Sequence, residues 1–468
     1  MLLSLGFPYI WRMQNIFRVL IALLAFAIPI EHKYDKPMRF FSQRLIPEGL
    51  ILPKWFETKV YFHPSDLIAP LLILIAIFAF KIPLRRLFFQ RSASFLWTLL
   101  CFATISIIAS PLCHYPLPYF RLWQWITAIF LFCLAANRKE TSPLVLGSLI
   151  AAATCQSLLA IAQYFHQSSF GLRLLGEPSF HRSMDNVCGF KVPGGYRWVF
   201  DRWFGMSFDT NLLVRVMGTT SHPNVLGGFL ALTSLATLDF FDRSKRKWIW
   251  ALLLFLQLFA LTVTFSRAAI FGFGFGACIW FAMKRRHSPH LFKVAALLIS
   301  FAAIFGFLFQ DQIIHRGGIV NYNKLATESD AYRLEQQNLA FQMIQKYPLT
   351  GVGFQQFSTR AHEFLGIDPQ QHVNGVHNIY LITAAEMGLP ALLCFLAFLL
   401  SLFLSLRYAE YSPFLSSLTA ILIAFLFIGF CDFYPTQFQM GRLLLFLTAG
   451  LLAAHGKEKP FPISQPSL

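Results

Sequence analysis

Three polar stretches interrupt an otherwise apolar chain, and their residue types could bind an anion or move a proton. They are RVMGTTSHPNVLGG at 215–228, TFSRAAIFGFGFG at 264–276 and GVHNIYLITAAEMGLP at 375–390. Their candidate residues are Arg215, His222, Asn224, Arg267, His377, Asn378 and Glu386. An arginine fork matches phosphate oxygens, and a neutral histidine can take a proton from a hydroxyl.

Together these groups fit the transfer of a group from a lipid pyrophosphate to a hydroxyl. Fixed guanidinium groups can neutralise a departing pyrophosphate without a metal. No outward DxD-like or HExxH-like cluster indicates a bound cation. We therefore expect neither a metal nor a cofactor.

Each stretch also has a purely structural explanation. The first could be a capped junction between a loop and a helix. Arg267 could extend to lipid headgroups from a tight turn. Asn378 could cap a helix while His377 is merely solvated.

The elements that must position these residues are membrane helices. The 468-residue chain is 56% hydrophobic and only 13% charged, with a mean hydropathy of +0.55. Many apolar runs approach the ~20 residues that cross a bilayer as a helix. We predict an all-α polytopic membrane protein forming a single integral membrane domain, residues 1–468.

Twelve apolar runs are candidate spans. They are 16–30, 67–80, 93–110, 119–136, 143–165, 223–241, 248–265, 268–283, 291–309, 379–406, 413–431 and 438–455. If the N-terminus is cytoplasmic, every cytoplasmic loop contains Lys or Arg, whereas the short outer loops 111–118 and 432–437 contain none. This distribution predicts that both termini are cytoplasmic. It also accounts for the net charge of +17, and basic residues scattered among spans give no reason to expect a nucleic acid partner.

Three long connections, 31–66, 166–222 and 310–378, would then face the periplasm or its equivalent. The last and main one contains a predicted helix near 329–347, ended by Pro348. Long polar loops on a rigid scaffold are frequent positions for functional sites.

Four sequence motifs, in their order along the chain, resemble those of the O-antigen ligase and polymerase superfamily. RLEQQNLAFQMIQKYPLTGVGFQQF at 333–357, followed by HNIYLITAAEMGLP at 377–390, resembles its signature region. GTTSHPNVLGG at 218–228 and TFSRAAIFGF at 264–273 resemble its two upstream motifs. Twelve spans with a large periplasmic loop before the tenth also match.

This resemblance implies a bacterial inner-membrane glycosyltransferase with a GT-C-type helical bundle and a periplasmic active site. The donor would be an undecaprenyl-pyrophosphate-linked glycan. The acceptor would be a hydroxyl of lipid A–core oligosaccharide, and transfer would invert the anomeric carbon without a metal. By the same resemblance His377 would be the catalytic base or a group that orients the acceptor. Arg215 and Arg267 would hold the donor pyrophosphate, and Arg333 would hold the loop or the donor in place.

Other motif residues have less defined roles. Asn378 and Glu386 match the pattern, but Glu386 lies ~13 Å along the helix from His377 and on another face, so we do not expect it to orient His377. SHPN, with His222 and Asn224, stands where many members have NPN. His222 is therefore a second outward histidine that could share the role of base.

Three other functions remain open at this point. A repeat-unit polymerase would use the same donor with another lipid-linked glycan as acceptor, and a protein O-oligosaccharyltransferase would use a protein. A lipid-glycan transporter would need polar residues near the middle of the bilayer, whereas here they gather at the outer face.

Overall fold

The described part of the chain is almost wholly helical in a computed structural model. The structure describes residues 6–30, 63–80, 91–181, 184, 188–191, 212–316, 324–368, 371, 373–409, 412 and 414–456. A helix lies at each of the twelve apolar ranges. These helices are α1 (Gly6–Ala27), α3 (Pro64–Phe80), α5 (Arg91–Ala109), α6 (Pro116–Ala136), α7 (Ser142–His166), α9 (Pro223–Arg243), α10 (Lys247–Val263), α11 (Arg267–Lys284), α12 (Leu291–Leu308), α17 (Ile379–Met387) with α18 (Leu389–Ser405), α19 (Leu415–Gly429) and α21 (Gln439–His455).

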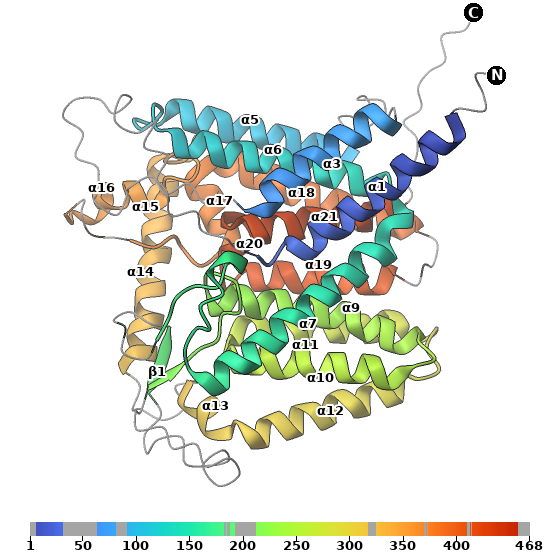
Figure 1. Cartoon of the computed structure of the whole chain (residues 1–468). Helices are drawn as coiled ribbons and strands as arrows, with labels where there is room; N and C mark the ends of the chain where they lie inside the picture. The colour runs from blue at the N-terminus through green and yellow to red at the C-terminus, as the bar shows by residue number, and fades with distance from the viewer. Residues whose placement is uncertain are drawn as a thin grey trace, which may run out of the picture.

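These helices lie side by side in one bundle (Figure 1). α6 packs against α21, α9 against α10, α11 against α19, and α5 against α18. Among the described residues five helices are long and apolar enough to cross a membrane: Ser92–Ala109, Leu117–Ala136, Lys139–His166, Pro223–Arg243 and Leu291–Leu308. The chain is an all-α membrane protein, and twelve crossings with a GT-C-type arrangement stay predictions.

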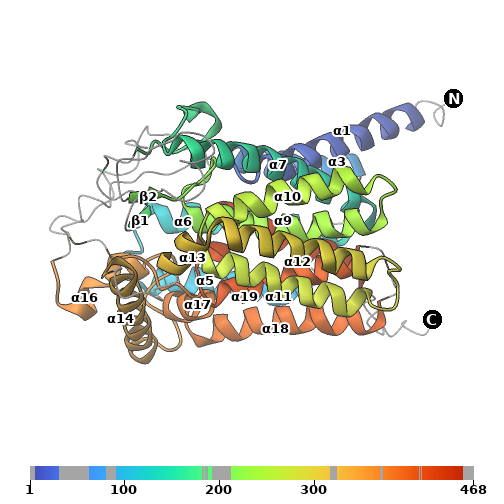
Figure 2. The ribbon, with the colours of Figure 1, turned by 90° about the horizontal axis from the view of Figure 1, so that it is seen from below.

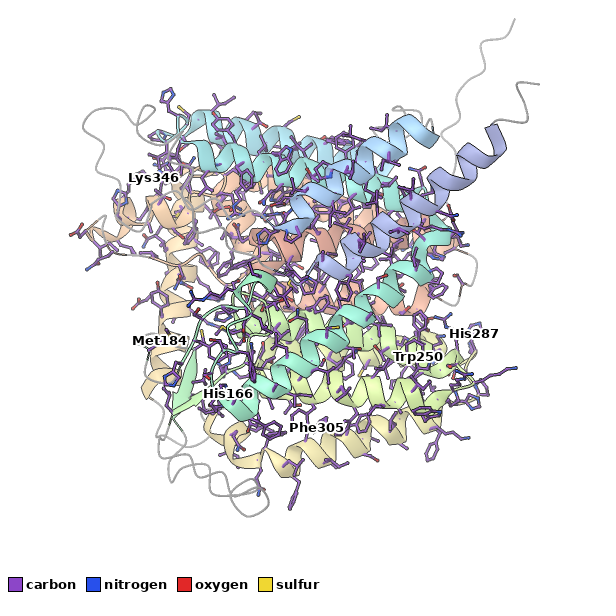
Figure 3. All side chains as sticks on the ribbon, viewed as in Figure 1. His166, Met184, Trp250, His287, Phe305 and Lys346 are labelled. Atoms are coloured by element: carbon purple, nitrogen blue, oxygen red, sulfur yellow. The ribbon has the colours of Figure 1, made fainter. Side chains whose placement is uncertain are left out.

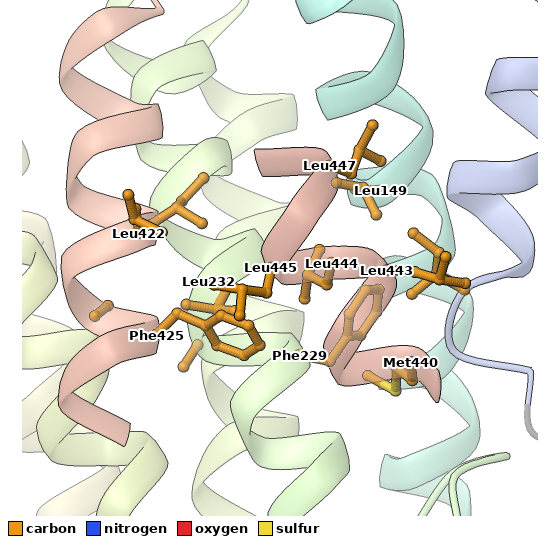
Figure 4. Close-up of a cluster of buried hydrophobic side chains, with 14 of the residues drawn as sticks. Leu149, Phe229, Leu232, Leu422, Phe425, Met440, Leu443, Leu444, Leu445 and Leu447 are labelled. Atoms are coloured by element: carbon orange, nitrogen blue, oxygen red, sulfur yellow. The ribbon is translucent and has the colours of Figure 1, made fainter. Parts of the chain in front are cut away.

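The centre of the bundle is a close-packed apolar core. Phe229 and Leu232 of α9 meet Phe425 of α19 and Leu445 of α21 there (Figure 4). None of the four is more than 1% exposed. Such packing fixes the helix ends, and therefore the loops and polar residues attached to them.

The two ends of the bundle differ. His166, Met184 and Lys346 mark one end, where the long connections gather, whereas Trp250 and His287 mark the other (Figure 3). We call the first the loop end. The basic connections 242–247 and 284–290 lie at the opposite end, and the orientation of the bundle in a membrane stays a prediction.

Two connections contain structure at the loop end. In 166–222 a strand pair joins β1 (Gly189–Lys191) to β2 (Leu212–Val214), with Phe190 opposite Leu213 in antiparallel register; the sequence did not predict these strands. In the main connection α14 (Lys324–Lys346) runs across the ends of the spans and is seen nearly end-on in Figure 2. Most of the connection 31–66 lies outside the described residues.

Shorter elements complete the described chain. They are α13 (Gln310–Arg316), α15 (Phe357–Arg360), α16 (His362–Leu365), α20 (Tyr434–Gln437), η2 (Lys139–Thr141), η3 (Arg173–Leu175) and η4 (Leu406–Tyr408). α20 is a single turn between α19 and α21, and it lies beside the candidate site.

The predicted continuous span 379–406 is broken at Gly388. This glycine has a φ of +84°, and a Cβ atom there would lie 2.2 Å from the Leu349 carbonyl oxygen. Pro390 follows in the first turn of α18, where a missing N–H costs nothing. The break lets the turn after α14 pack directly against the backbone of the tenth span.

Candidate active site

Arg215 follows β2 and lies buried beneath the loop end. Its Nε donates to the Thr264 carbonyl oxygen at 2.7 Å, and its guanidinium donates to Asn224 Oδ1, also at 2.7 Å. The side chain is only 6% exposed. These contacts join the first predicted polar stretch to the second and hold the guanidinium in one place.

His222 is the N-cap of α9. Its Nδ1 accepts a hydrogen bond from the Asn224 backbone N–H at 3.1 Å. Burial lowers the pKa of the His222 imidazole to about 4, and the charge of Arg215 acts in the same direction. The neutral ring is therefore engaged in capping, as the structural interpretation of this stretch proposed.

Asp432, between α19 and α20, is the acidic centre of the site. Its Oδ2 accepts from Asn224 Nδ2 at 2.8 Å, and its Oδ1 accepts from the Phe433 N–H at 2.8 Å. Burial raises the pKa of this carboxyl, but contact with His377, the charges of His377 and His222, and the Asn224 amide outweigh burial and lower the pKa to about 2. Asp432 is therefore a carboxylate near neutral pH.

His377 lies against this carboxylate. Its Nδ1 is 3.6 Å from Asp432 Oδ1, and its ring meets the ring of Phe433 edge to face with centroids 4.8 Å apart. The side chain is 22% exposed. The imidazole thus has one nitrogen toward a buried anion and part of its surface open.

Asn378 serves as the N-cap of α17. Its Oδ1 accepts from the backbone N–H groups of Tyr380 at 2.9 Å and Leu381 at 3.0 Å. Its Nδ2 donates to the Phe430 carbonyl oxygen. These contacts orient the segment that carries His377.

Arg267 and Arg333 reach the same region from other elements. Arg267 is the first residue of α11, and Arg333 lies on α14; both are half-buried. The charges of both arginines act on Cys431, the residue directly before Asp432. The charge of Arg333 also acts on His222. Both guanidinium groups therefore act on the turn that carries Asp432.

Glu386 lies apart from His377. Its carboxylate accepts from the Phe357 N–H at 3.3 Å and from Gln437 Nε2 at 3.1 Å. The residue is 2% exposed and lies where α17, the turn after α14 and α20 meet. The expectation that it does not touch His377 agrees with these contacts.

Sequence reasoning missed Asp432. It is the only acidic residue in the short connection 432–437, and a lone carboxylate directly after an apolar run is a recognisable signal. Asn224 bridges this carboxylate to Arg215, so residues far apart in the chain form one network. Among the described residues no three His, Cys, Asp or Glu side chains are grouped to hold a metal ion.

Comparison with known proteins identifies the central part of the chain. No curated protein matches it. A family model described as O-antigen ligase matches residues 252–396, a segment that contains Arg267, Arg333 and His377. Residues 252–396 therefore belong to the O-antigen ligase family, whose members are enzymes of O-antigen assembly.

Proposed function

We propose that this protein is a glycosyltransferase that moves an O-antigen glycan from undecaprenyl pyrophosphate to a hydroxyl of lipid A–core oligosaccharide. The observation that carries this proposal is the placement of His377 against buried Asp432 at the loop end, with Arg267 and Arg333 around the same turn. The match to the O-antigen ligase family supports the substrate class. The loop end would face the periplasm of a bacterial inner membrane, with both chain termini on the cytoplasmic side.

His377 is the proposed base. The Asp432 carboxylate favours the tautomer with its proton on Nδ1 and leaves the Nε2 lone pair to accept a proton. As the acceptor hydroxyl loses this proton, its oxygen bonds to the anomeric carbon of the donor from the face opposite the pyrophosphate. The bond from that carbon to the pyrophosphate oxygen breaks, its electrons leave with the pyrophosphate, and the configuration inverts.

The arginines are the proposed partners of the departing pyrophosphate. Arg267 and Arg333 are half-buried and come from two elements, so they could approach the phosphates from different sides. Arg215 is buried, so its proposed part is to contribute positive charge from beneath and to orient Asp432 through Asn224. No metal is needed for this charge balance.

His222 is not the proposed base. Its Nδ1 already accepts the Asn224 N–H, and in the neutral ring the other nitrogen carries the proton. A base role for His222 would break the cap of α9. We therefore propose that His377 alone removes the proton.

Deletion of the gene in its host, read on a lipopolysaccharide gel, tests the proposed function. We expect polymer to disappear from lipid A–core while lipid-linked polymer accumulates. Wild-type and His287→Ala genes should restore the pattern, because His287 is an exposed residue at the opposite end, and His377→Ala should not. Core capped by one repeat unit would instead indicate a polymerase, and lipid-linked polymer confined to the cytoplasmic leaflet would indicate a transporter.

A further inference from the structure

The single-turn helix α20 links Asp432 to two polar groups that the proposed chemistry does not use. Asp432 accepts from the first N–H groups of this turn, Phe433 at 2.8 Å and Tyr434 at 3.4 Å. The backbone continues through the turn, with the Gln437 N–H donating to the Phe433 carbonyl oxygen at 3.1 Å. A displacement at one end of so short an element must therefore move the other.

Glu386 holds the carboxyl end of α20 from the side of α17. Its carboxylate accepts from Gln437 Nε2 at 3.1 Å and from the Phe357 N–H at 3.3 Å. Gln355 Nε2 donates to the other side-chain atom of Gln437, the oxygen Oε1. The Gln437 amide is thus held on both sides, by Glu386 at its nitrogen and by Gln355 at its oxygen.

Arg442 holds the same end from the side of α21. One guanidinium nitrogen donates to the carbonyl oxygens of Thr436 and Gln437, both at 2.9 Å. Another donates to Gln124 Oε1 at 2.6 Å. Arg442 is 0% exposed, and a charged group is kept in such surroundings only where its partners are specific.

The hydrogen bonds of Arg442 continue into two further helices, α6 and α3. Gln124 of α6 donates from Nε2 to Asp66 Oδ2 of α3 at 3.1 Å, and Gln439 donates to Asp66 Oδ1 at 2.7 Å. Arg442 and the carboxyl group of Asp66 therefore share two hydrogen-bond partners, Gln124 and Gln439. The contacts between Arg442 and α20 are therefore supported by the helices of the bundle rather than by a loop.

We propose that Glu386 and Arg442 are positioning residues that act through α20. They fix the carboxyl end of this turn, so that Asp432 at its amino end stays beside His377. This inference rests on the proposed function, in which the pair of Asp432 and His377 removes the acceptor proton. It gives Glu386, which lies deep and away from His377, a part in the reaction.

Exchanging the two partners of one hydrogen bond tests the proposal. In Glu386→Gln one of the two accepting oxygens becomes an NH2 group, which then faces a donor, either the Phe357 N–H or Gln437 Nε2. In Gln437→Glu two carboxylates face each other. In the double variant the amide introduced at position 386 can accept from the Phe357 N–H and donate to the carboxylate introduced at position 437. Both contacts are then restored, the second with its polarity reversed.

The three variants are compared with Glu140→Gln, a control at an exposed ion pair. All are purified at full length and reconstituted in liposomes. Transfer from an undecaprenyl-pyrophosphate glycan to lipid A–core is followed, and rates are normalised to folded protein.

We expect each single variant to lower kcat by roughly 10- to 100-fold with little change in the donor KM, because the reacting groups are displaced and donor binding is not. The double variant should return to within about threefold of wild type, since the two changes are strongly coupled. Arg442→Lys, which cannot span all four acceptor oxygens of Thr436, Gln437, Gln124 and Gln439, should also lose kcat. A double variant no faster than the slower single variant, or a loss expressed in the donor KM alone, would overturn the proposal. Failure of the wild-type protein to transfer would instead contradict the proposed function itself.

Discussion

At the scale of single residues, Asp432 decides how His377 can act. Replacing it by Asn keeps a similar shape and an oxygen for Asn224 Nδ2, but removes the charge that favours the Nδ1–H tautomer. We expect Asp432→Asn to lower kcat by roughly 10²- to 10⁴-fold, the usual contribution of an oriented base. Steady-state transfer rates measure this directly. A variant with near-normal kcat, in a protein inactivated by His377→Ala, would mean that the carboxylate does not orient the base.

His222 makes the loop end sensitive to acid. Its pKa in the folded protein is about 4, below the ordinary 6.5, so the unfolded chain binds a proton at a pH where the folded chain does not. The stability that the neutral cap contributes is present above pH 6.5 and is lost as the pH falls from 6.5 to 4. We expect the unfolding temperature of the wild type to fall across this window more than that of His222→Asn, whose side chain also caps a helix but does not titrate. Equal pH dependence in both proteins would count against the assigned cap.

At the scale of elements, the turn after α14 is seated on the break between α17 and α18. Gly351 has a φ of +68°, and a Cβ atom there would lie 2.3 Å from the Glu386 carbonyl carbon. Gly366 has nearly the same φ, +62°, with nothing within 4 Å of its Cβ position, so it serves as a matched control. Gly366→Ala should cost only the roughly 1–2 kcal/mol of a left-handed residue.

Gly351→Ala should cost more than Gly366→Ala, because the backbones must also separate. It should reduce transfer as well, since the turn lies next to Glu386. Thermal unfolding and transfer rates of both variants check this. Similar losses of stability in the two variants would show that the turn can move away from α17 freely.

The same elements show which features of the fold could be predicted from the sequence. Apolar runs placed most of the long apolar helices to within several residues, because burial in lipid or core needs a continuous stretch of apolar side chains. The exception is α1, which begins at Gly6, well before the predicted start at residue 16. The break at Gly388 escaped notice because apolar residues continue on both sides of it, so that the two helices form one apolar run. The strands at 189–191 and 212–214 escaped because two three-residue strands carry too little periodicity to be recognised.

At the scale of the whole molecule, the candidate site depends on contacts between distant parts of the chain. His377, Arg267 and Arg215 could be singled out by residue type and by the side of the membrane they were expected to face. The sequence could not predict that Asn224 links Arg215 to Asp432, because Asn224 and Asp432 are 208 positions apart. Glu386 and Arg442 lie in or beside apolar runs, and only the packed bundle shows that both hold α20.

Glycan transfer by the reconstituted protein tests the central claim most directly. Liposomes containing the purified full-length protein and lipid A–core are supplied with an undecaprenyl-pyrophosphate glycan, and the appearance of glycan on the core is measured. The proposed function predicts transfer by the wild type and by His287→Ala, and none above background by His377→Ala with an unchanged unfolding temperature. Transfer by His377→Ala at a near-normal rate, or no transfer by the wild type, would contradict it.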